Sequence, residues 1–145
     1  MPEIVDQLAN ARMLALTGEF QEALSIISQI LEIDPSNIEA LRLRGNAIEL
    51  SALGEMSPGP IEDRSRDLDL ALESYEAILR IVPEDTLAMK DLADHYSRFR
   101  DKNHALKLYS QLIGVLQKQE TRGLDVREEL REAIEDSESL KQEIF

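Results

Sequence analysis

Apolar residues recur along the chain every three or four positions, in segments that end at prolines or polar turns. In one segment Ile27, Ile30 and Leu31 come shortly before Pro35. A second segment has apolar residues at similar spacing and ends at Pro83. This spacing places the apolar side chains on one face of an α-helix. The pattern therefore predicts an all-α protein.

Three of these segments can be laid over one another, which indicates an internal repeat. Each contains an alanine followed four positions later by a large apolar residue, in the pairs Ala23 and Ile27, Ala71 and Tyr75, and Ala105 and Tyr109. A small residue lets two helices approach closely where they cross, and the larger side chain one turn away fills the remaining space. We therefore expect three helical hairpins.

The hairpins resemble the tetratricopeptide repeat, a 34-residue helix-turn-helix unit with a proline after its second helix. With Pro35 and Pro83 at that proline position, the repeats begin at Ile4, Ile38 and Thr86. The small position of each first helix then holds Ala11, Gly45 or Ala93. The resemblance implies an α-α superhelix, a short solenoid of antiparallel hairpins forming one domain over residues 1–145. Its repeats span about 4–37, 38–85 and 86–119.

The second repeat departs from the pattern by an insertion. Pro35 and Pro83 lie 48 residues apart, so about 14 extra residues fall near 52–65. The Pro-Gly-Pro run there cannot be helical, which predicts a loop at 54–60 and a second helix lengthened at its start. The insertion is either a functional element or a local elaboration. In the third repeat Gln117 replaces the proline, so we expect its second helix to continue to about residue 121.

A further helix is predicted over about 125–144. An acidic cap at Asp125 with Glu128 three residues later is a start signal. An apolar stripe follows at helical spacing, and the opposite face is charged. Terminal repeats need a polar cover, and this helix is suited to capping the solenoid. Its alternative use is dimerisation.

The charge and composition limit the classes of partner. The 145 residues carry a formal net charge of −13 and contain no cysteine. Such a charge repels nucleic-acid backbones and anionic lipid surfaces, so neither is expected as a partner. The start of the chain shows no signal-peptide pattern and no apolar run is long enough to span a membrane, so we expect a cytoplasmic protein.

No catalytic, cofactor-binding or metal-binding constellation is evident, and we do not expect an enzyme. The two histidines, His95 and His104, fall in the two helices of the third hairpin. We expect His95 to be packed in the core and His104 to be exposed.

In tetratricopeptide proteins the first helices of the repeats line a concave groove that holds a peptide or a helix. The resemblance carries this role onto fifteen positions of the chain. Four of them are basic and three acidic, a balance of +1 inside a strongly acidic protein. The positions are Val5, Leu8, Arg12, Ala15 and Leu16; Glu39, Arg42, Asn46, Glu49 and Leu50; and Leu87, Lys90, Asp94, Ser97 and Arg98.

The groove positions predict a protein or peptide partner with acidic and apolar residues. Its carboxylates would meet Arg12, Arg42 and Lys90, and Asn46 would hold its backbone. The alternative is that the charges pair with one another, Arg42 with Glu39 or Glu49 and Lys90 with Asp94. The clamp of basic and amide residues by which some of these repeats grip chaperone tails is absent, because Leu8 and Asp91 are among the residues at its positions.

The function predicted from these features is a protein-protein interaction module, either an adaptor or an assembly scaffold. The alternative is a self-associating structural protein that uses the C-terminal helix or the groove to contact another copy.

Overall fold

The computed structural model describes the backbone of residues 3–54 and 61–144, and the side chains of 3–53 and 66–144. Within these residues the chain forms seven α-helices and no strand, which confirms the all-α class. The helices are α1 (Ile4–Leu16), α2 (Phe20–Ile33), α3 (Ile38–Gly54), α4 (Ile61–Ile81), α5 (Thr86–Phe99), α6 (Lys102–Thr121) and α7 (Arg127–Ile144).

The helices divide into two compact units, Met1–Ile81 and Val82–Phe145. The first contains α1 to α4 and the second α5 to α7. Helices that follow one another within a unit pack together, and α1 also contacts α3. The single domain over residues 1–145 stays a prediction.

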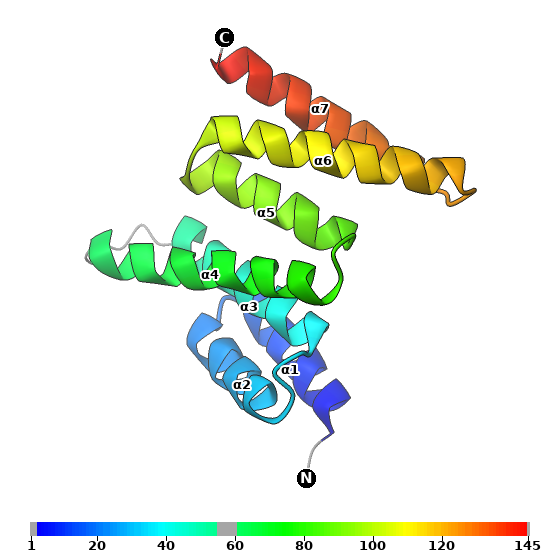
Figure 1. The fold of residues 1–145 in the computed structure, drawn as a ribbon. Helices are drawn as coiled ribbons and strands as arrows, with labels where there is room; N and C mark the ends of the chain where they lie inside the picture. Colours follow the sequence, from blue (N-terminus) through cyan, green and yellow to red (C-terminus); the bar gives the residue numbers. More distant parts are fainter. Residues whose placement is uncertain (1–2, 55–60, 145) are drawn as a thin grey trace. The chain divides into compact units, whose positions relative to one another are not determined.

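The first unit consists of two helical hairpins, α1–α2 and α3–α4 (Figure 1). Small residues lie where its helices meet, since Ala15, Ala23 and Ala47 form one buried cluster. A second cluster contains large apolar side chains such as Ile27 and Ile30, both completely buried. The packing therefore follows the small-and-large pattern of the sequence.

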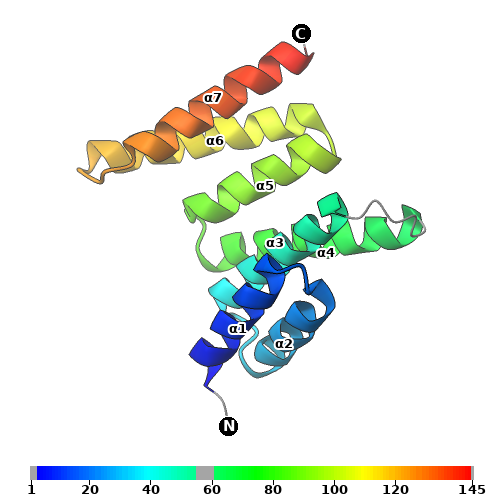
Figure 2. The same ribbon diagram turned by 180° about the vertical axis from the view of Figure 1, so that it is seen from behind.

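The second unit is the hairpin α5–α6 followed by α7, which lies beside α6 in both views (Figure 1 and Figure 2). The predicted extension of α6 is confirmed, because the helix ends at Thr121. The apolar stripe of α7 supplies Ala133, Ser137 and Leu140 to the buried interior, while Ile134 on the same helix is 42% exposed. Its opposite face is charged, so α7 covers α6 with a polar surface.

The helix ends have local causes in the sequence. Asp85 accepts a hydrogen bond from the backbone N–H of Ala88 at the start of α5, which satisfies a donor that the helix itself leaves unpaired. Gly18 and Gly123, just after α1 and α6, have φ of 85° and 91°, a conformation that glycine adopts without a steric cost. The chain can therefore reverse direction at these two points.

The second hairpin differs from the first in length. Helix α4 has 21 residues, whereas α2 has 14, so the helix after the insertion is longer, as expected. The predicted loop at 54–60 falls almost wholly outside the described residues.

In α3, Arg44 stands at a position where the repeat pattern expects leucine, and its Nε donates a hydrogen bond to Ser74 Oγ at 2.7 Å. Burial lowers the pKa of Arg44, and the nearby Glu73 opposes that shift.

Candidate functional site

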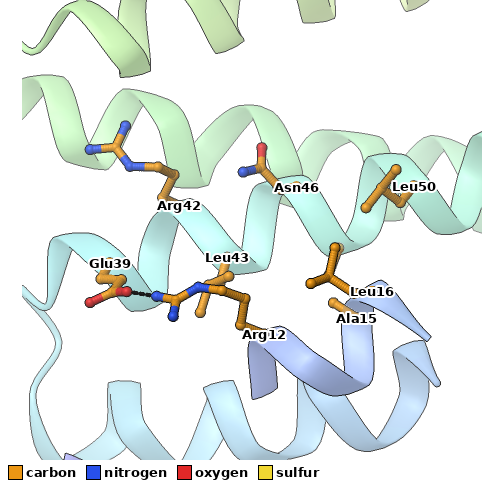
Figure 3. Close-up of a pocket in the computed structure, with 9 residues that line it drawn as sticks. Arg12, Ala15, Leu16, Glu39, Arg42, Leu43, Asn46 and Leu50 are labelled. Carbon is orange, nitrogen blue, oxygen red and sulfur yellow. Dashed lines mark ion pairs between the residues drawn. The ribbon is translucent and has the colours of Figure 1, made fainter. Parts of the chain in front are cut away.

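A pocket of about 440 Å³ lies between the first helices of the first two hairpins, α1 and α3 (Figure 3). Its volume is in the range of sites that hold small ligands or side chains of a partner. Its lining comprises Arg12, Ala15, Leu16, Glu39, Arg42, Leu43, Asn46, Ala47 and Leu50.

One end of the pocket is apolar. Ala15 and Ala47 are buried and form its floor, and their small side chains leave space above them. Leu16 and Leu50 line the same end but are 72% and 45% exposed. Large apolar side chains gathered around a hollow mark a surface that another molecule can cover.

The other end of the pocket is charged. Arg12 on α1 forms an ion pair with Glu39 on α3, shown by the dashed line in Figure 3. Their side chains are 48% and 50% exposed, so water reaches both. Arg42 and Asn46 follow on α3, at intervals that bring them to the same side of that helix. The pocket is thus apolar at one end and charged at the other, where two arginines and one carboxylate line it.

Asn46 of α3 contacts the hydroxyl of Tyr75 on α4. The Tyr75 hydroxyl oxygen lies 2.9 Å from Asn46 Oδ1 and also hydrogen-bonds to the carboxylate of Glu49. Tyr75 is completely buried and passes over Gly45, where a Cβ atom would lie 2.5 Å from the tyrosine ring. The amide of Asn46 has further hydrogen-bonding capacity beyond its contact with Tyr75.

The same arrangement recurs in the second unit. Tyr109 of α6 donates a hydrogen bond to Asp94 of α5, and Lys90 Nζ lies 3.1 Å from the other oxygen of that carboxylate. Asn46 and Asp94 each stand eight residues after the start of their helix, at Ile38 and Thr86. The hairpins therefore share a device in which a tyrosine of the second helix holds a polar residue of the first.

The first hairpin lacks this device. The residue eight positions after Ile4 is Arg12, and the position of the tyrosine holds Ile27, which has no hydroxyl. Arg12 is held by Glu39 of the next hairpin instead.

The structure brings seven of the ten predicted groove residues of the first two repeats to the pocket. They are Arg12, Ala15, Leu16, Glu39, Arg42, Asn46 and Leu50. Three others do not line it. Val5 is 72% exposed elsewhere on α1, while Leu8 and Glu49 are 5% and 7% exposed and belong to the interior.

The burial of Leu8 and Glu49 has a physical cause. Leu8 packs against Ile27 and Ile30 in the core of the first hairpin, and Glu49 turns inward to the hydroxyl of Tyr75. A carboxylate with such a buried donor gains a hydrogen bond that offsets its loss of water. Neither side chain is available to a partner in this structure.

Two residues of the pocket, Leu43 and Ala47, were not among the predicted groove positions. Both lie on α3 and line the pocket; Leu43 is labelled in Figure 3. The family pattern points to side chains that project into the groove, whereas these form its base. Their helical spacing from Glu39 and Leu50 was the signal that could have identified them.

The predicted groove residues of the third repeat lie in the second unit. Lys90, Asp94, Ser97 and Arg98 line a separate cavity of about 290 Å³ together with residues of α6 and α7. Leu87 is not among its lining residues and is 57% exposed. The predicted pairing of Lys90 with Asp94 is confirmed. A single groove that runs over all three repeats stays a prediction.

Asp136 of α7 lines this second cavity near Asp94. Burial raises the pKa of Asp136, and the charge of Asp94 raises it further against the opposing effect of Lys90. Burial also raises the pKa of Tyr109, and its hydrogen bond to Asp94 adds to that shift. The negative charge on Asp136 is therefore unfavourable in the folded protein.

Asp136→Asn is expected to stabilise the protein at pH 7, by less than about 1 kcal/mol because water screens a partly exposed charge. A carboxyl whose pKa is raised by folding lowers stability above the folded-state pKa, and this cost vanishes below the ordinary value of 3.8. The gain should thus be complete at pH 7 and shrink as the pH falls towards 4, as measured by urea unfolding.

Glu129→Gln, which removes the same charge from the first turn of α7, serves as the control for Asp136→Asn. It is expected not to stabilise the protein, since an acidic residue there interacts favourably with the helix dipole. An equal gain from both variants would show that only net charge matters.

The histidines behave as expected. His95 is completely buried beside Phe99 and accepts a hydrogen bond from Arg100 Nε at 3.2 Å, while His104 is exposed.

In the part of the chain that the structure describes, no three His, Asp or Glu side chains are grouped so that they could hold a metal ion. None of the described helices has the length and apolar character needed to cross a membrane.

The paired helices, the small residues at their crossings and the additional last helix define a tetratricopeptide repeat fold, as the sequence predicted. The structure is similar to the TPR domain of Sgt2 from Aspergillus fumigatus, with a TM-score of 0.69 and 19% sequence identity over 99% of this chain and 80% of that one. A second match is the MamA protein, with a TM-score of 0.34 and 15% identity over 94% of this chain and 90% of that one. No protein-family model and no curated protein sequence matches the chain.

Proposed function

We propose that the protein is a non-catalytic interaction module, an adaptor or assembly scaffold in the cytoplasm, that binds a segment of a partner protein in the pocket between α1 and α3. The observation that carries the proposal is the make-up of this pocket. Exposed leucines surround an apolar floor at one end, and arginines stand at the other.

The apolar end supports burial by a partner. Leu16 and Leu50 line it, and Leu53, one turn further along α3, is 56% exposed. Covering a leucine side chain contributes about 1.5–3 kcal/mol when burial is complete. A partner that covers two or three of them gains enough to offset part of the cost of ordering its own chain.

The charged end supports an acidic partner segment. The whole chain has a formal net charge of −13, yet the pocket is lined by two arginines and a single carboxylate. A local excess of positive charge in an acidic protein favours carboxylates at this place and disfavours basic partners.

The dimensions of the pocket indicate the length of the bound segment. Along α3 the lining runs from Glu39 to Leu50, a distance of about 16 Å at 1.5 Å per helical residue. An extended peptide covers this distance with about five residues. A short linear segment is therefore sufficient.

The proposal can be tested with peptides selected on the full chain from a random display library. A selected peptide is then titrated into protein with labelled methyl groups. Signals of Leu16, Leu43 and Leu50 should shift, whereas those of Leu124 and Ile134 in the second unit should not. Failure to select any peptide, or shifts that avoid the pocket, would contradict the proposal.

Leu50→Asp should weaken peptide binding by about tenfold or more, because it places a charge in the apolar end of the pocket. Ile33→Asp is the matched control, since Ile33 is 70% exposed in the same unit and does not line the pocket. Equal weakening by the two variants would place the binding site elsewhere. Sedimentation of the protein alone would show whether it associates with a second copy. Sedimentation with the peptide present would show whether the peptide competes with that copy for this surface.

A further inference from the structure

The position eight residues after the start of each first helix carries a different polar residue in each hairpin. Asn46 and Asp94 are held by tyrosines of their own hairpins, Tyr75 and Tyr109. Arg12 has Ile27 at the position of the tyrosine, and its ion pair is with Glu39 across the pocket. Arg12 is thus held by a group of the pocket itself.

We propose that Glu39 occupies the place of a partner's carboxylate, and that an acidic side chain of the partner displaces Glu39 from Arg12 on binding. The inference rests on the proposed function and adds that binding of the partner exchanges the ion pair of Arg12. The partner segment carries a carboxylate at the Arg12 end and a large apolar side chain at the Leu16 and Leu50 end.

The exchange is feasible because the internal ion pair is weakly held. Both side chains are about half exposed, at 48% and 50%, and pairs of this kind contribute little net stability. Glu39 remains accessible to water when it leaves Arg12, so its carboxylate stays hydrated. A carboxylate delivered by a partner that also excludes water from the pocket interacts with the guanidinium more strongly than Glu39 does.

The layout of the pocket restricts the spacing within the partner segment. Arg12 and Leu16 lie one helical turn apart on α1, about 6 Å, while Arg42 and Leu50 are separated by about 12 Å along α3. An extended chain covers these distances with about two to four residues. We therefore expect an acidic residue and a large apolar residue separated by one to three others.

Glu39→Gln tests the exchange, with peptides selected on the full chain and their analogues in which the acidic residue is changed to its amide. The variant keeps the size of the side chain but competes less well for Arg12. It should bind the acidic peptide about two- to fivefold more tightly, the range expected for loss of an exposed ion pair. Binding of the amide analogue should not change, and the gain should diminish at high salt.

Two further variants make the result specific. Glu22→Gln removes the same charge from the exposed surface of α2, outside the pocket, and should leave binding unchanged. Arg12→Gln should weaken the acidic peptide by at least about threefold and remove the difference between the acidic peptide and its amide analogue. Circular dichroism checks that each variant is folded.

The outcomes separate this inference from the proposed function. If Leu50→Asp weakens binding as expected but Glu39→Gln does not strengthen it, the pocket binds a partner and the proposed role of Glu39 is wrong. Selected peptides without an acidic residue overturn the inference in the same way. If Leu50→Asp has no effect, the proposed function itself is wrong.

Discussion

Gly45→Ala is expected to destabilise the protein by about 1–3 kcal/mol, although alanine is the better helix former. A Cβ at this position would lie 2.5 Å and 2.7 Å from ring atoms of Tyr75, which is completely buried. Relieving such a contact forces the ring or the helices apart, and overpacking of this kind outweighs the gain of about 1 kcal/mol in helix propensity. Urea unfolding followed by circular dichroism measures the change.

Gly114→Ala is the matched control for this prediction. Gly114 also lies within a helix, α6, but a Cβ there would meet no atom within 4 Å beyond its chain neighbours and the backbone of its own helix. The same substitution should therefore stabilise the protein by up to about 1 kcal/mol. If both variants proved stabilising, the close approach of Tyr75 to α3 would be wrong.

Tyr75→Phe should also destabilise the protein, by about 1–3 kcal/mol. The change keeps the ring and removes only the hydroxyl, which hydrogen-bonds to the buried carboxylate of Glu49 and lies next to the amide of Asn46. Removing one partner from buried polar groups costs the desolvation of the groups left behind. The effect should appear as a lower urea midpoint with an unchanged slope.

Tyr109→Phe and Tyr96→Phe are the comparison variants for Tyr75→Phe. Tyr109 has the equivalent role in the second unit, but the side chain of Asp94 is 17% exposed and keeps its contact with Lys90, whereas Glu49 is only 7% exposed, so the loss should be smaller. The hydroxyl of Tyr96 makes no hydrogen bond to the described residues, and its removal should be nearly neutral. Equal losses from all three variants would show that these hydroxyl contacts do not determine stability.

These two predictions connect the core to the pocket. Gly45 lets the ring of Tyr75 reach α3, and the hydroxyl of Tyr75 holds Asn46, which lines the pocket. A polar group that is fixed before a ligand arrives loses less freedom on binding. Asn46 is thus a preorganised part of the proposed binding surface.

The residue pattern predicted the helices well because their causes are local. The helices α1, α3 and α5 begin at Ile4, Ile38 and Thr86, the residues at which the repeat pattern placed the starts of its units. Helical periodicity and small residues at fixed positions are visible in the sequence, and each hairpin packs mainly against its neighbours. The length of α6 could likewise be predicted from the missing proline.

The candidate site was predicted only in part. Seven groove residues of the first two repeats meet at the pocket, because their positions along the helices follow the repeat pattern. Leu8 and Glu49 turned inward, and no sequence pattern paired Arg12 with Glu39. Such contacts depend on how far two helices separate and on which neighbouring side chain is within reach.

The amino-acid sequence by itself determined the helical class, the hairpins and the acidic character of this protein. It does so because helix formation and small-to-large packing depend on residues three or four positions apart. Only the tertiary structure decided which polar residues of α1 and α3 are tied to a tyrosine and which face the pocket. That choice depends on contacts between residues about 30 positions apart, such as Asn46 with Tyr75 and Arg12 with Glu39.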